Sequence, residues 1–132
     1  MIKIDSDELQ KLYLAYFGRP GDPSGLNYWL SPSNDSLTLK SISNQLSCQN
    51  EYMNFMGNKS IEFQINNVYV NLFNRKADVD SLNYWLRMVN NQKFIISDIV
   101  FQLIDSKNQS NLINLAITDE DINILSNKIY AA

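Results

Sequence analysis

Hydrophobic side chains recur every three or four residues through most of the 132-residue chain, the spacing that buries one face of an α-helix. Ser6, followed by two acidic residues, predicts the N-cap of a first helix, and Gly18 predicts its end, because glycine adopts the left-handed conformation that closes helices. Asp22 before Pro23 predicts a second helix, and Ser36 the cap of a third. The apolar positions of these helices are Leu9, Leu12, Tyr13, Tyr16, Phe17, Leu26, Trp29, Leu30, Leu39, Ile42 and Leu46.

The same signals continue through the second half of the chain. A short helix is expected to stop at Gly57, and Ser60, Asp78 and Ser97 are the predicted caps of three further helices. Thr118, followed by three acidic residues, has the signature of a capping box at the start of a last helix. Because no run of alternating polar and apolar residues is bounded by hairpin turns, the sequence predicts a compact all-α domain.

An internal repeat organises these elements. The stretch 13–30 matches the stretch 69–86 without a gap, at a constant shift of 56 positions, and nine of the 18 aligned residues are identical. The chain is therefore expected to be a single domain, 1–132, with repeat one at about 4–57, repeat two at about 60–106 and a helical tail at 108–132.

Composition and charge exclude several classes of function. The chain has 11 basic and 14 acidic residues, a net charge of −3, and no basic stripe of the kind that binds nucleic acid. No apolar run is long enough to cross a membrane, so no membrane insertion is expected. The chain has no histidine and a single cysteine, Cys48, so it lacks an imidazole base, an intramolecular disulfide and a Cys/His zinc site.

The repeated motif contains the candidate functional residues. Its arginine and aspartate flank a tight connection between two helices, where they either satisfy exposed helix ends or hold an anion or a sugar. Tyr16 is of interest because its partner in the second copy is Leu72, and a tyrosine in place of a plain hydrophobe suits either a half-buried position or the edge of a site. The candidate glycan-binding residues are Tyr16, Arg19, Asp22, Tyr28, Arg75, Asp78 and Tyr84, and the expected structural residues are Tyr13, Phe17, Trp29, Tyr69, Phe73 and Trp85.

Metal, cofactor and catalytic sites are not expected. Acidic clusters such as 119–121 lack the alternating ligands and distal glutamate of a calcium loop, and acids in the first turn of a helix explain them. The chain has neither a nucleophile with an adjacent base nor a glycine-rich phosphate loop, so we expect no enzyme activity and no cofactor.

The motif Y-x-x-x-F-x-R-x-x-D-x-x-x-L-x-Y-W resembles the repeat of domain-of-unknown-function family 4214. In the first copy the resemblance rests on the positions Tyr13, Phe17, Gly18, Arg19, Asp22, Gly25, Leu26, Tyr28 and Trp29, with Ser47, Glu51 and Tyr52 loosely matching a following S-x-E-Y segment. The second copy has Asn74 and Ser81 where that family favours glycine. The resemblance implies a helical domain from large secreted bacterial proteins, including surface-layer and hemolysin-type proteins.

From that resemblance we expect a non-catalytic, N-terminal module that anchors a surface-layer-type protein to lipopolysaccharide or another surface polysaccharide. The implied location is extracellular, at the cell surface, after export without a cleaved signal peptide, and the implied partners are the polysaccharide, the rest of a larger parent protein and further copies in self-assembly. A protein–protein assembly module is the alternative, because the repeat also resembles phycobilisome linker domains. An enzyme acting on polysaccharide is a third hypothesis.

Overall fold

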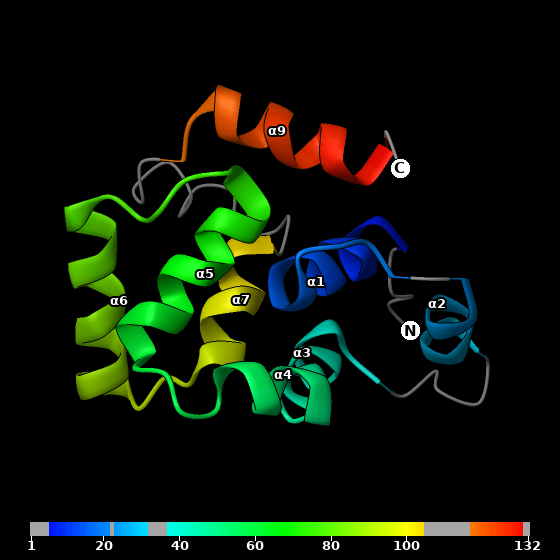
Figure 1. Cartoon of the computed structure of the whole chain (residues 1–132), viewed down its shortest axis with the longest axis horizontal. Helices are drawn as coiled ribbons and strands as arrows, with labels where there is room; N and C mark the ends of the chain where they lie inside the picture. The colour runs from blue at the N-terminus through cyan, green and yellow to red at the C-terminus, as the bar shows by residue number, and fades with distance from the viewer. Residues whose placement is uncertain (1–5, 22, 32–36, 105–116, 131–132) are drawn as a thin grey trace.

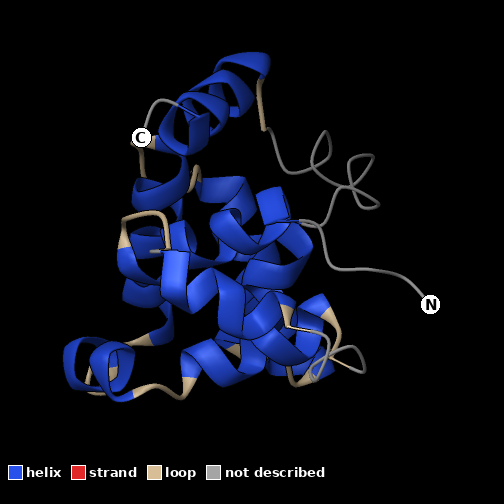
Figure 2. Cartoon of the chain, turned by 90° about the vertical axis from the view of Figure 1, so that its right-hand side faces the viewer, coloured by secondary structure: helices blue, strands red, loops and turns tan. Residues whose placement is uncertain are grey.

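The computed structural model describes residues 6–21, 23–31, 37–104 and 117–130, and these form eight helices and no strand (Figures 1 and 2). The helices are α1 (Ser6–Phe17), α2 (Pro23–Leu30), α3 (Leu39–Ser47), α4 (Asn50–Met56), α5 (Ile61–Phe73), α6 (Val79–Gln92), α7 (Ile96–Ile104) and α9 (Asp119–Tyr130). The all-α fold predicted from the sequence is confirmed.

Equivalent helices of the two repeats pack against each other. Helix α1 packs on α5, and α3 packs on α7, while α2 and α6 lie at opposite ends of the molecule (Figure 1). Helix α9 lies across α5 and α1. The core therefore forms between the repeats, and neither repeat buries its apolar face alone.

The two copies share their local hydrogen bonds. The backbone N–H of Gly21 donates to Oε1 of Gln10 at 2.8 Å, and the backbone N–H of Ala77, 56 positions later, donates to Oδ1 of Asn66 at 3.1 Å. These bonds fold each connection back on the helix before it. The connections thus have the same construction in both copies.

Most of the predicted helix boundaries are confirmed. The hydroxyl of Ser60 accepts from the N–H of Phe63, and the carboxylate of Asp78 accepts from the N–H of Ser81. Gly18 ends α1 in the left-handed conformation, with φ of 72°. Its equivalent in the second copy, Asn74, ends α5 in the same conformation without being glycine.

Of three further predicted helix boundaries, two are wrong and one is confirmed. Thr38, rather than Ser36, caps α3, because its hydroxyl and that of Ser41 form a reciprocal capping box. Ser97 is the second residue of α7 and not the residue before it, and the carboxylate of Asp98 accepts from the N–H of Ile95, which precedes the helix. Gly57 ends α4 as predicted.

A buried aromatic hydrogen bond anchors each repeat. The indole N–H of Trp29 donates to the hydroxyl of Tyr13 at 2.8 Å, and the indole N–H of Trp85 donates to that of Tyr69 at 2.9 Å. These four side chains belong to the core, as does Phe73, whereas Phe17 is partly exposed beside it. Each large ring thus buries its polar atom with a partner, which avoids the cost of an unpaired buried donor.

Candidate functional site

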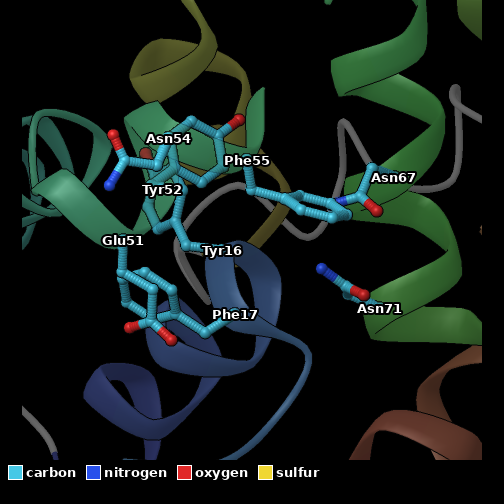
Figure 3. A pocket seen from close by; sticks show the side chains of 8 residues that line it. All are labelled: Tyr16, Phe17, Glu51, Tyr52, Asn54, Phe55, Asn67 and Asn71. Carbon is cyan, nitrogen blue, oxygen red and sulfur yellow. The ribbon is translucent and has the colours of Figure 1, made fainter. Parts of the chain in front are cut away.

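A pocket of about 530 Å³ opens between the end of α1, helix α4 and the middle of α5 (Figure 3). Its volume is in the range of small-ligand sites. The lining side chains combine aromatic rings, amides and one carboxylate: Tyr16, Phe17, Glu51, Tyr52, Asn54, Phe55, Asn67 and Asn71.

The floor of the pocket contains two buried tyrosines that stay neutral. The rings of Tyr16 and Tyr52 meet edge to face, with 5.1 Å between their centroids. The hydroxyl of Ser43 donates to the backbone carbonyl of Ser97, so the hydroxyl of Tyr16 donates in turn to Ser43 at 2.8 Å. Burial raises the pKa of Tyr16 well above its ordinary value, and it raises the pKa of Tyr52 to about 12.

Among the described lining residues Glu51 is the only acidic or basic side chain, and it forms an ion pair with Arg19. One guanidinium nitrogen of Arg19 donates to both carboxylate oxygens, at 2.9 and 3.2 Å. The same guanidinium lies 5.7 Å from the centre of the Phe17 ring, which favours this position through a cation–π contact. The rim of the pocket is thus an ion pair with no net charge.

Three asparagines supply the polar part of the wall. The side chains of Asn67 and Asn71 come from one face of α5 and point toward the space between α5, α4 and α1 (Figure 3). The amide nitrogen of Asn71 donates to the carbonyl of Ala15 at 2.9 Å. Within the described part of the chain, the side chains of Asn54 and Asn67 make no hydrogen bond to protein, so their donors and acceptors face solvent or a ligand.

The two repeats differ from each other at this pocket. Tyr16 is equivalent to Leu72, and Asn71 is equivalent to Ala15, so each of these two polar lining residues stands where the other copy has a small or apolar residue. Leu72 and Ala15 are fully buried, and α9 packs on the helices that carry them. Leu72 and Ala15 thus lie in the core, whereas their counterparts Tyr16 and Asn71 line the pocket.

The arginine of the second copy, Arg75, pairs with a helix other than the one that Arg19 contacts. Arg75 forms a two-pronged ion pair with Asp121 at the start of α9, at 3.0 and 2.7 Å, and lies 3.9 Å from Asp78. Burial by itself would raise the pKa of Asp121, but hydrogen bonds from Arg75 and Thr118 outweigh it and hold that pKa below its ordinary value. Asp78 caps α6. This cluster joins α9 to the second repeat.

The structure brings two of the predicted glycan-binding residues to the pocket: Tyr16 in its lining and Arg19 at its rim. Arg75 and Asp78 lie in the separate cluster beside α9, Tyr28 is exposed on α2, and Tyr84 lies on α6. Asp22 lies outside the described residues. The sequence analysis did not select Phe55 or the amides of Asn54, Asn67 and Asn71, and the only sequence signal for any of them was the difference between the copies at position 71.

No three histidine, cysteine or acidic side chains of the described segments are grouped as a metal site would require, and no helix in those segments has the length and apolarity needed to cross a bilayer. Comparison of the chain with protein-family models, with curated proteins and with solved structures finds no match. The resemblance to family 4214 therefore remains an expectation from the motif.

Proposed function

We propose that this domain is a non-catalytic module that binds surface polysaccharide, lipopolysaccharide included, and holds a larger surface-layer-type protein on the outside of the cell. The α1–α4–α5 pocket carries the proposal, because it combines exposed aromatic carbon with amides that have unused hydrogen-bonding groups. Sugars present the same combination of apolar C–H faces and hydroxyl groups. The motif resemblance supports the same function independently.

The pocket favours binding over hydrolysis of the sugar. Glycoside hydrolysis uses a pair of carboxyl groups on either side of the scissile bond, one of which is protonated at working pH. Among the described lining residues Glu51 is the single carboxylate, and the guanidinium of Arg19 donates to both of its oxygens, so no second carboxyl faces it across the pocket. The buried tyrosines keep their protons and do not serve as bases.

Binding of the whole chain to purified lipopolysaccharide and capsular polysaccharide, measured by isothermal titration calorimetry, tests the proposal. A Phe55→Ala variant should lose most of the binding. Phe63→Ala is the matched control, because Phe63 is also an exposed helical phenylalanine, 47% exposed against 65% for Phe55, but lies outside the pocket lining. Absence of binding to any polysaccharide would show the proposal wrong, and specific capture of a protein partner instead would favour the assembly alternative.

A further inference from the structure

The charge of the pocket limits which sugars it accepts. Anionic sugars carry phosphate or carboxylate groups, and proteins bind these groups with free guanidinium or ammonium side chains. The described residues that line the pocket include neither, and Arg19 at the rim is already bound to Glu51 through both carboxylate oxygens. An anionic group entering here would lie beside a carboxylate and would have to break this pair to gain a cation.

The hydrogen-bonding groups of the pocket match uncharged partners. Each asparagine amide has two donor hydrogens and one acceptor oxygen, and a sugar hydroxyl or acetamido group both donates and accepts. Asn67 and Asn54 have this capacity unused. The amide nitrogen of Asn71 donates one hydrogen bond to the carbonyl of Ala15, and its acceptor oxygen, which lies close to Gly18, is still available to a ligand.

The position of Asn71 depends on Gly18. A β-carbon at residue 18 would lie 3.1 Å from the side-chain oxygen of Asn71, which is closer than ordinary packing. The equivalent pair on the other side of the repeat is Asn74, in the second copy, and Ala15, in the first, so the small residue and the amide have exchanged places. The pairing of Gly18 with Asn71 is thus specific to the side of the molecule on which the pocket opens.

The apolar part of the pocket provides a flat surface on which a sugar ring can pack. The phenyl ring of Phe55 is 65% exposed and extends from α4 toward Asn67 (Figure 3). Removing apolar carbon from water is favourable, so a ligand with an apolar face is stabilised on this ring. A sugar ring can pack its C–H face on the phenyl ring while its hydroxyl groups form hydrogen bonds with the asparagine amides.

We infer that the α1–α4–α5 pocket binds uncharged sugar residues, hexoses or N-acetylhexosamines, and discriminates against phosphorylated and acidic ones. This inference rests on the proposed polysaccharide-binding function and adds the class of sugar and its site. Asn67 and Asn71 determine the specificity, and Phe55 provides the apolar contact. Because the pocket carries no net charge at its rim, binding of the neutral sugar should depend little on salt.

The test compares short neutral oligosaccharides with uronic-acid and phosphorylated oligosaccharides of the same length, using the whole chain and titration calorimetry at low and high salt. Neutral oligosaccharides should bind, and Phe55→Ala and Asn67→Leu should each weaken that binding about tenfold or more. Asn71→Ala should act in the same way, and it introduces the residue that the first copy already has at the equivalent position. Phe63→Ala should leave binding unchanged, and circular dichroism should show all variants folded.

The outcomes separate this inference from the proposed function. Preferential binding of acidic sugars, weakened by salt, would overturn the inference while the domain remained a polysaccharide binder. Neutral binding that is insensitive to Phe55, Asn67 and Asn71 would overturn the assignment of the pocket in the same way. Binding of no polysaccharide or oligosaccharide at all would overturn both.

Discussion

Replacing the arginine of each repeat by alanine should have unequal effects on stability. Arg19 and Arg75 occupy equivalent motif positions, and each pairs with an acid in the first turn of a later helix, Glu51 in α4 or Asp121 in α9. The pairs differ in exposure. Both side chains of the first are more than half exposed, at 56% and 58%, whereas Arg75 is 33% exposed and Asp121 only 5%.

The magnitudes follow from that difference. Exposed ion pairs contribute little, so Arg19→Ala should cost less than about 0.5 kcal/mol. Removing one partner of a fully buried pair costs about 3–5 kcal/mol, because the other charge stays buried without compensation. Arg75 is partly solvated and Asp121 keeps its hydrogen bonds to Thr118, so we reduce this figure to about 2 kcal/mol for Arg75→Ala.

Urea unfolding followed by circular dichroism at helix wavelengths measures both values. The carboxyl of Asp121 has a depressed pKa in the folded protein, so the stabilisation by the pair is present above the unfolded pKa of about 4 and is lost as pH falls through the folded value. The difference in the free energy of unfolding between wild type and Arg75→Ala should therefore become smaller below about pH 4. The reasoning would be refuted if the two variants lost the same free energy of unfolding, or if the loss for Arg75→Ala did not depend on pH.

Three further predictions concern single side chains. Tyr69→Phe should cost about 1–2 kcal/mol in urea unfolding, because it leaves the buried N–H of Trp85 without its partner, and a loss near zero would contradict the role of that bond. Because burial raises the pKa of Tyr52 to about 12, folding stability should fall as pH rises from about 10 to 12, and Tyr52→Phe should flatten that fall in unfolding measurements; an unchanged profile would argue against it. Gly18→Ala should lower stability by about 1–2 kcal/mol, since φ there is 72°, and it should weaken sugar binding by crowding Asn71; melting curves that match wild type would count against this.

Local signals in the sequence predicted the boundaries that depend on local chemistry. Ser60, Asp78 and Thr118 each cap a helix as expected, because an N-cap needs only a short polar side chain and the first turn that follows it. The cap predicted at Ser97 is wrong, because α7 begins one residue earlier, at Ile96, and the carboxylate of Asp98 binds the N–H of Ile95 before it. The hydroxyl of Ser97 instead faces Asn44 of the other repeat, 3.4 Å away, a contact that no local pattern contains.

The partners of the motif arginines and the pocket itself could not be predicted in this way. Glu51 lies 32 residues from Arg19, and Asp121 lies 46 residues from Arg75, so each pairing exists only after distant helices have packed. The pocket likewise needs α1, α4 and α5 together. What the sequence did contain was the difference between the copies at Tyr16, and a systematic comparison of all non-identical positions would have added Asn71.

The paired tryptophans give the molecule two built-in optical reporters. Trp29 and Trp85 are the only tryptophans of the chain, one lies in each repeat, and each is hydrogen-bonded to the equivalent tyrosine. A chain with Trp29→Phe would report on the second repeat by its fluorescence, and one with Trp85→Phe would report on the first. Because α1 packs on α5 and α3 on α7, both reporters should follow a single unfolding transition. Two separated transitions would mean that the halves of this duplicated chain still behave as independent folding units.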